Sequence, residues 1–579
     1  MKYGINMTAS KIRGFGMKKT ITVCLIACII FYLVFHFYTS GPVSSVTLPY
    51  SLEETISRRL STRNYISVDI SSQQLLDVLW AAYGYANAHR SAPLIGYDHS
   101  LIIFPVNATG SYQYIPENNS LVTHDLSVNK ETIRSHDQGW PSDASAVLVV
   151  VWNSTKMSNG FFASAEAGCF VQNVYLAAAS LDLGTCCVGY IESAGLRSDL
   201  GLSDDLTPLL VMPLGYPADP YPPASPNYDM MTGNLPPVQY SNMSFKEATA
   251  NVTFAHHWTA ENLSQQELSQ LLWATYGYTN VTHDSTYHRT TPSAYGIYPL
   301  VIFVSNATGV YQYLPETHSV VELLSGDKRW EMEKTCSVQT WAADAPALFL
   351  VAYNSSYNNG DTGDGGAVSH EFIEVDSGAA VQQLFLEASA FNLSANIVSN
   401  SLETWNGATA EELRNILNLP QSLIPLYLIP IGHKTTTPIH DVAAANITPS
   451  QTMVIAGTTL DINVTIQNLG DYVENCSLTL YANATVIGNQ TVHNFLDGTT
   501  STLTFTWNTI GFEMGNYTLA ASIEPVPDET NTDNNSLDDI QIIIIPEFST
   551  AVLVLLMLAT FLIVIAYKNK LGCLRLSLR

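Results

Sequence analysis

An internal repeat is the feature that most constrains the fold of this chain. The stretch LLDVLWAAYGYANAHRSAP, which begins at Leu75, aligns with LSQLLWATYGYTNVTHDSTYHRTTP, which begins at Leu268, after one short insertion. Further matches follow in the same order, among them LIIFPVNATGSYQYIPE with LVIFVSNATGVYQYLPE and EAGCFVQNVYLAAASLDL with DSGAAVQQLFLEASAFNL. An ordered series of matches indicates a duplicated domain. We therefore predict homologous domains over residues 48–217 and 241–434, joined by a Pro-rich linker over 218–240.

Each repeat mixes helices and strands. In the first repeat, LLDVLWAAYGYA has a helical pattern, and LIIFPVN is an apolar strand that leads through a hairpin into SYQYIP. AVLVVVW is a second buried strand, an Ala-rich helix starts near Glu166, and LLVMPLGY is the last strand. Strands and helices do not alternate strictly, so the sequence predicts the α+β class.

The C-terminal part has a different pattern. From about Asp441, runs such as TTLDINVTIQNLGD and STLTFTWNT alternate apolar and polar residues and are separated by Gly and Asn turns. This pattern is typical of an immunoglobulin-like β-sandwich, which we predict over residues 440–543.

Two apolar segments predict membrane anchoring. Ile21–Tyr38 follows lysines, Ser549–Tyr567 precedes lysines, and each is long enough for a transmembrane helix. Because basic flanks stay inside the cell, residues 1–20 and 568–579 are expected in the cytoplasm and the bulk of the chain outside the cell membrane. Cleavage of the first segment as a signal peptide remains an alternative. Several N-x-[ST] triplets, including those at Asn107 and Asn306, fit an extracellular glycoprotein.

Charge and residue spacing argue against three features, a nucleic-acid partner, a disulfide framework and a metal site. A net charge of -26 argues against nucleic acid as a partner, since a polyanion requires a basic surface. The cysteines between the apolar segments show no disulfide spacing and are expected to be buried thiols. The pairs His256/His257 and His283/His288 match no metal template, so we predict surface or capping roles for them and no metal site.

One cluster of cations stands out in this acidic chain. The stretch ISRRLSTRNYIS contains Arg58, Arg59 and Arg63. Guanidinium groups bind phosphate in a bidentate manner, and a neighbouring serine can add a hydrogen bond. A phosphate site and a solvated basic patch both fit these residues.

The run LEETISRRLSTRNYIS, with QQLLDVLWAAYG after it, resembles the opening of the nitroreductase family of FMN-dependent oxidoreductases. The resemblance is closest to the branch that oxidises thiazolines and oxazolines in modified peptides. The family's Ser-x-Arg-x-aromatic motif binds the FMN phosphate, which implies Arg59, Ser61 and Arg63 here. RTTPSAYGIYPL resembles the family's Pro-Ser motif, and GCFVQNVYLAAASLDLGTCCVGY resembles its helix and glycine turn.

Each repeat has kept different family motifs. The first keeps the arginines and the glycine turn, and the second keeps the Pro-Ser motif. Family members are dimers with FMN at the interface, so the resemblance implies an intrachain pseudo-dimer with one FMN. Arg59, Ser61 and Arg63 would then bind the FMN phosphate. Gly184, Thr185 and Gly189 would line the edge of the flavin ring, and Pro292, Ser293 and Ala294 would close its far side. No catalytic residue is assigned, since the flavin carries the hydride.

The C-terminal features resemble parts of archaeal surface proteins. The sandwich is similar to cell-adhesion-related domains and is expected to be a spacer or to contact other surface proteins. IIPEFSTAVLVLLMLATFLIVIAYKNK resembles archaeal Pro-Glu-Phe anchors. Together with the apolar segments, the family resemblance thus implies a membrane-anchored extracytoplasmic FMN oxidoreductase acting on a small or peptidic substrate. The alternative is a flavin-free relative that serves as a cell-surface binding or structural module.

Overall fold

The computed structural model describes residues 50–86, 89–95, 98–283, 286–335, 342–359, 370–398, 408–435, 439–495, 499–546 and 558–563, all within the unit Tyr50–Arg579. The predicted membrane segment Ile21–Tyr38 lies outside these ranges, and Ser549–Tyr567 is described only at 558–563. Within the ranges, none of the helices combines the length and the apolar character that crossing a bilayer requires.

The first repeat is built on a six-stranded antiparallel sheet with the strand order β5-β4-β3-β6-β8-β7. Its strands are β3 (Leu101–Asn107), β4 (Gly110–Ile115), β5 (Ser120–Asp125), β6 (Ala146–Asn153), β7 (Gly184–Thr185) and β8 (Leu206–Gly215). Strand β6 is a continuous apolar run because both of its faces are covered: Leu148 contributes to one core cluster and Val149 to another.

The second repeat has the same architecture, with the strand order β13-β12-β11-β14-β16-β15. Its strands are β11 (Leu300–Asn306), β12 (Gly309–Leu314), β13 (Ser319–Ser325), β14 (Ala347–Asn354), β15 (Leu393–Ala395) and β16 (Leu423–His433). Each repeat also has a small hairpin, β1 (Tyr85–Ala86) with β2 (His89–Arg90), and β9 (Tyr278–His283) with β10 (Thr286–Arg289). The predicted α+β class and duplication are confirmed.

The helices also correspond between the repeats. The first repeat has α2 (Leu52–Arg58), α3 (Ser72–Tyr83), α4 (Lys130–Ile133), α5 (Gly160–Ser180) and α6 (Ser193–Asp199). The second has α7 (Phe245–Asn251), α8 (Gln265–Tyr276), α9 (Arg329–Lys334), α10 (His370–Ala390) and α11 (Ala408–Leu417). The predicted start of the Ala-rich helix near Glu166 is wrong. Helix α5 begins at Gly160, because the side chain of Asn159 accepts a hydrogen bond from the backbone N–H of Phe161 and caps the helix earlier.

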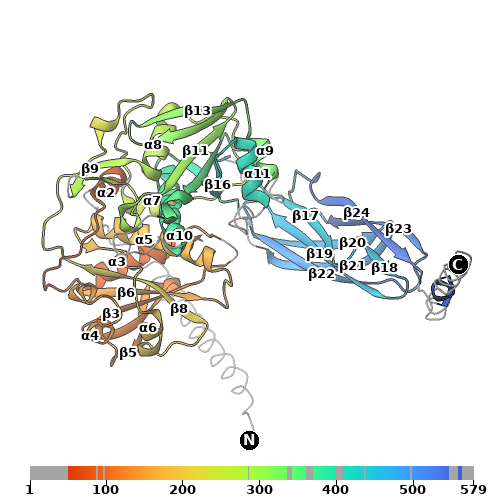
Figure 1. Ribbon diagram of the computed structural model, residues 1–579, viewed down its shortest axis with the longest axis horizontal. Coiled ribbons are helices and arrows are strands. Elements are labelled where there is room, and N and C mark those ends of the chain that lie inside the picture. The colour runs from red at the N-terminus through yellow and green to blue at the C-terminus, as the bar shows by residue number, and fades with distance from the viewer. Residues whose placement is uncertain are drawn as a thin grey trace, which may run out of the picture. The chain divides into compact units, whose positions relative to one another are not determined.

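The two repeats meet at their central helices. Figure 1 shows α5 and α10 between the two sheets, and one hydrophobic core cluster contains residues of both repeats. Gly168 of α5 faces the carbonyl oxygen of Val375, and Gly378 of α10 faces that of Ala165. A Cβ atom at either glycine would collide with that backbone oxygen, so only glycine permits this close crossing.

Polar contacts repeat the same two-fold pattern across the interface. Gln172 Nε2 donates to the carbonyl oxygen of Thr290 (3.3 Å), and the equivalent Gln382 Nε2 donates to that of Ser91 (3.2 Å). The side chains of Gln172, Gln382 and Ser91 are buried. These paired bonds hold the segment that follows the small hairpin of each repeat against the central helix of the other repeat.

The N-A-T triplets form matching turns in the two repeats. Asn107 Oδ1 accepts a hydrogen bond from the backbone N–H of Thr109 (2.8 Å), and Asn306 Oδ1 accepts one from Thr308 (2.9 Å). Such Asx turns reverse the chain between β3 and β4 and between β11 and β12. These triplets therefore have a structural role, and glycosylation stays a prediction.

The C-terminal domain consists of two sheets. One has the strand order β17-β19-β22 and the other β18-β24-β23-β20-β21. The strands are β17 (Val442–Pro449), β18 (Met453–Ile455), β19 (Thr459–Asn468), β20 (Glu474–Ala482), β21 (Thr485–Phe495), β22 (Thr500–Asn508), β23 (Gly515–Ile523) and β24 (Ser536–Ile545). Their alternating inward residues form a separate core around Trp507, which confirms the predicted β-sandwich.

Candidate functional site

A cavity of about 360 Å³ is lined by residues of both repeats. Its volume lies within the range of about 300–1,000 Å³ that is common for small-molecule sites. Among its lining residues are six that the sequence predicted: Ser61, Arg63, Gly189, Pro292, Ser293 and Ala294. The structure thus places residues of the arginine motif and the glycine turn, both from the first repeat, in one cavity with residues of the Pro-Ser motif from the second repeat. We call this cavity the open site.

Arg63 gives the open site a free positive charge. Its side chain is exposed, lines the cavity, and makes no hydrogen bond or ion pair with the residues that the structure describes. The neighbouring Ser61 hydroxyl is hydrogen-bonded to the Tyr175 hydroxyl (2.9 Å). In a chain with a net charge of -26, this unpaired guanidinium is suited to an anionic ligand.

The other two arginines of the cluster have different environments. Arg58 pairs with Asp182 and lies over the ring of Tyr50. Arg59 is only 1% exposed, and its Nε and Nη2 donate to the carbonyl oxygen of Arg289 at 3.4 and 3.2 Å. Arg59 Nη1 is buried without a partner among the described residues, and Arg59 does not line the cavity.

The predicted glycine turn lies partly behind the cavity. Gly184 and Thr185 form β7, are buried and do not line the cavity. The carbonyl oxygen of Thr185 accepts from the backbone N–H of Thr62 (2.8 Å), which fixes the arginine segment beside the turn. Gly189 does line the cavity, and the ring of Phe372 from the second repeat occupies the space that a Cβ atom would need.

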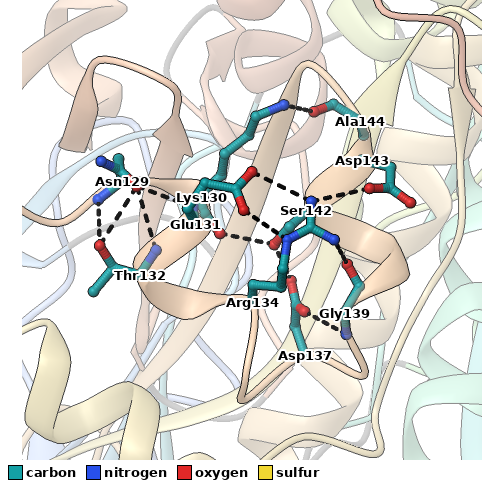
Figure 2. Close-up of polar contacts among 10 residues, drawn as sticks. All are labelled: Asn129, Lys130, Glu131, Thr132, Arg134, Asp137, Gly139, Ser142, Asp143 and Ala144. Atoms are coloured by element: carbon teal, nitrogen blue, oxygen red, sulfur yellow. Dashed lines mark hydrogen bonds and ion pairs between the residues drawn. The ribbon is translucent and has the colours of Figure 1, made fainter.

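A loop of the first repeat forms part of the rim. Gln138 and Trp140 line the cavity, and Gln138 Nε2 donates to the carbonyl oxygen of Tyr190 (2.9 Å). Figure 2 shows how Arg134 holds this loop, donating to Glu131, to Asp143 and to the carbonyl oxygen of Gly139. These bonds position the loop before any ligand is bound.

Asp376 is a cavity residue that the sequence prediction missed. It is 5% exposed, lines the cavity, and accepts hydrogen bonds from Ser293 Oγ (2.6 Å) and from the backbone N–H of Ala294 (3.2 Å). Burial raises the pKa of Asp376 to about 7, although these two bonds lower it. The aligned runs EAGCF and DSGAA contain the available signal, an acid at the same position of both repeats.

Two thiols also line the cavity. Cys186 is buried and Cys187 is half-buried, and both are free. Burial raises the pKa of both thiols, and the nearby Asp376 contributes to the increase at Cys187. Cys169 and Cys476 are also buried and free, as predicted, whereas Cys336 lies outside the described residues.

The symmetry-related position in the other half is filled with aromatic rings. Tyr65 pairs with Pro217 after β8, and Trp258 pairs with Lys434 after β16. Counting back from these pairs puts Phe254 at the position of Ser61. Its ring centroid lies 5.2 Å from that of His89 and 5.7 Å from that of Phe385. We call this cluster of Phe254, His89 and Phe385 the filled site.

The filled site also lacks the cation of the open site. His256 takes the place of Arg63. The predicted surface or capping role of His256 is wrong, because it is 8% exposed and hydrogen-bonded to Asn396, and burial lowers its pKa to about 3. His257 Nε2 lies 3.0 Å from the carbonyl oxygen of Leu469. Among the described residues, no group of three or more His, Cys, Asp or Glu is arranged to hold a metal ion.

Comparisons with known proteins agree with this architecture. The nitroreductase family model matches residues 56–216 and 257–433, together more than half of the chain, and the CARDB model matches residues 442–539. A Methanocaldococcus jannaschii protein named "Putative nitroreductase" is 28% identical over 212 residues, which are 36% of this chain and 98% of that protein.

A solved structure shows the same fold for the two repeats. A crystal structure titled as a putative nitroreductase from Anabaena variabilis is 16% identical, covers 63% of this chain and 88% of its own, and has a TM-score of 0.51. At that identity the likeness shows the fold alone. The CARDB domain of a Pyrococcus furiosus protein is 24% identical, covers 20% of this chain and all of its own, and has a TM-score of 0.17.

Proposed function

Because this chain belongs to the nitroreductase family, we propose that it is an FMN-dependent oxidoreductase with one composite flavin site between its two repeats. The observation that carries the proposal is the open site. There Ser61, Arg63 and Gly189 of the first repeat line one cavity with Ser293 of the second. The symmetry-related position holds aromatic rings instead.

The residues of the open site fit a flavin nucleotide. Arg63 and Ser61 supply a free guanidinium and a hydroxyl for the phosphate. When bound, the flavin supplies hydride transfer. The chain positions it, limits the access of water, and polarises the substrate.

Arg59 has a positioning role in this proposal. It bonds to the carbonyl oxygen of Arg289, three residues before Pro292, and thereby connects the arginine motif of one repeat to the Pro-Ser motif of the other. Its charge also adds to the positive potential behind the cavity, where burial strengthens electrostatic interactions.

The substrate and location are further parts of the proposal. The resemblance of the first repeat to azoline-oxidising enzymes supports a small or peptidic substrate. The apolar segments Ile21–Tyr38 and Ser549–Tyr567, with lysines on their outer flanks, support anchoring in the cell membrane with the bulk of the chain outside. Protease added to intact cells should then digest the two repeats, whereas full protection would contradict this location.

The visible spectrum of the purified full chain tests the proposed function. The wild type should be yellow with one FMN per chain. Arg63→Ala should weaken FMN binding about 10- to 100-fold, the effect of losing hydrogen bonds to a charged group. Arg197→Ala is the matched control, because this half-buried arginine of the same repeat pairs only with the exposed Asp204 among the described residues, and it should retain FMN.

The alternative function predicts a different result. If the chain is a flavin-free binding or structural module, the wild type will be colourless and added FMN will not alter its melting temperature. Equal FMN binding by Arg63→Ala and Arg197→Ala would show instead that flavin binds elsewhere.

A further inference from the structure

The two central helices carry an acid at the same position. Glu166 in α5 and Asp376 in α10 each precede the crossing glycine by two residues. Neighbouring groups use the hydrogen-bonding capacity of the Glu166 carboxylate. Its oxygens accept hydrogen bonds from Tyr83 Oη (2.6 Å) and from Ser100 N and Oγ (3.0 and 2.8 Å), and His99 Nδ1 lies 2.8 Å away. This carboxylate has a purely structural environment.

Asp376 differs from Glu166 in its length and partners. Its side chain is one methylene shorter, and its only hydrogen-bond donors among the described residues are Ser293 Oγ and Ala294 N–H. Because the carboxylate lines the open site, it has room for a further partner on the cavity side. Duplication therefore left one saturated acid and one acid available to a ligand.

We propose that Asp376 is the catalytic acid and base of the open site, exchanging the proton that accompanies hydride transfer between flavin and substrate. This inference rests on the proposed function. When a substrate double bond is reduced, one of its atoms takes the hydride from the reduced flavin and the other takes a proton from Asp376, which becomes a carboxylate. In the reverse direction, the carboxylate takes the proton as the hydride leaves the substrate.

The other titratable groups around Asp376 are less suited to this exchange. Burial raises the pKa of Tyr175, Cys186 and Cys187, so these groups keep their protons. Tyr190 and Tyr295 lie at the solvent-exposed rim (76% and 55% exposed).

The groups that face Asp376 keep one charge state around neutral pH. Cys187 of the glycine turn and Tyr276 of α8 interact with it electrostatically, and burial raises the pKa of both. Arg63 lines the same cavity and remains a cation. With a pKa of about 7, Asp376 itself is poised to give and take a proton at neutral pH.

The test uses the FMN-loaded full chain with 1,4-benzoquinone as the acceptor. The bound flavin is reduced with dithionite, and its reoxidation rate is followed from pH 5 to pH 9. The wild-type rate should fall as the pH rises through about 7, because the proton donor is lost. Asp376→Asn keeps an oxygen acceptor for Ser293 and Ala294. It should retain FMN, react about 10²- to 10⁴-fold more slowly, and show no inflection.

A second measurement does not depend on activity. In the flavin-free protein, subtracting the pH-difference infrared spectrum of Asp376→Asn from that of the wild type should leave the carbonyl band of one protonated carboxyl that disappears near pH 7. The subtraction removes the bands of other buried acids such as Glu333, whose pKa burial also raises to about 7. Asp376→Glu should restore both the band and the pH-dependent rate. Asp69→Asn removes an exposed carboxylate and should behave as the wild type.

The outcomes separate the two proposals. A yellow Asp376→Asn variant with the wild-type pH profile, or a subtracted infrared spectrum without a carboxyl band, overturns the role of Asp376 and leaves the proposed function standing. A wild-type chain that binds no FMN overturns both.

Discussion

The open and filled sites started from the same fold and now differ in every feature that a nucleotide would need. The open site has Ser61, the free guanidinium of Arg63 and the acid Asp376 around a cavity. The filled site has Phe254 packed between the rings of His89 and Phe385, and beside it the buried, uncharged His256. The two positions thus differ in two respects, the presence of a cation and the presence of space, and the comparison teaches that either difference could decide whether a nucleotide binds.

The comparison also explains why both repeats keep their architecture. One hydrophobic core spans the two repeats, so the half that no longer contributes a cation still contributes packing and the Pro-Ser segment. The filled site therefore belongs to the hydrophobic core that also supports the open site. Three sets of variants can break or sharpen this comparison.

The largest effect is expected where the two halves cross. In Gly378→Ala, the new methyl group would collide with the carbonyl oxygen of Ala165, and backbone atoms cannot move aside without shifting a helix. The free energy of unfolding should fall by about 3 kcal/mol or more, and FMN should be lost. Gly160→Ala is the control, because its methyl group would lie 3.6 Å from the Trp152 ring. Equal urea denaturation curves for the two variants would contradict the close crossing.

Exchanging the residues that distinguish the two sites should weaken FMN binding when the open site is changed, but should lower only the stability when the filled site is changed. Ser61→Phe places a ring in the open site and should weaken FMN binding at least about tenfold, or about 1.4 kcal/mol. Phe254→Ser removes a half-buried ring and should lower the free energy of unfolding by about 2 kcal/mol without changing the one-to-one FMN ratio. Fluorescence titration and urea denaturation measure the two effects. A second FMN bound by Phe254→Ser would show that space alone, and not charge, closed the filled site.

The smallest effect concerns a buried acid that only the second repeat carries. Glu387 of α10 aligns with Ala177 of α5, is fully buried, and accepts from Gln270 Nε2 (2.9 Å). Burial and the nearby Glu53 raise its pKa. A raised pKa gives stability that is complete below the unfolded value of about 4.3 and is lost as the pH rises toward the folded value.

Glu387→Gln removes this pH dependence, since an amide does not titrate. Between pH 5 and pH 6 the free energy of unfolding of the wild type should fall by about 1 kcal/mol more than that of the variant. Urea denaturation at both pH values measures the difference. Parallel changes in the two proteins would mean that Glu387 is ionised in the folded state.

The sequence predicted the fold better than the roles of single residues. Strands β3 and β6 are continuous apolar runs with a repeated turn after β3, so their type was predictable. The start of α5 was not, because the cap at Asn159 precedes the apolar pattern. Arg59 and Arg63 look alike in the sequence. In the structure, however, Arg59 is buried between the two repeats, whereas Arg63 lies at the cavity. Asp376 was missed although both repeats have an acid at this position, because the sequence does not show which of the two acids is fully hydrogen-bonded within the fold, as Glu166 is, and which lines a cavity.

The crossing of α5 and α10 within one polypeptide has an evolutionary consequence. In a homodimer, every substitution is made twice and reaches both interface sites at once. Here each substitution is made once, so Phe254 could arise without placing a phenylalanine at the position of Ser61. The presence of both repeats in one chain thus allowed the paired pockets to diverge, so that one could keep its cation and cavity while the other was filled.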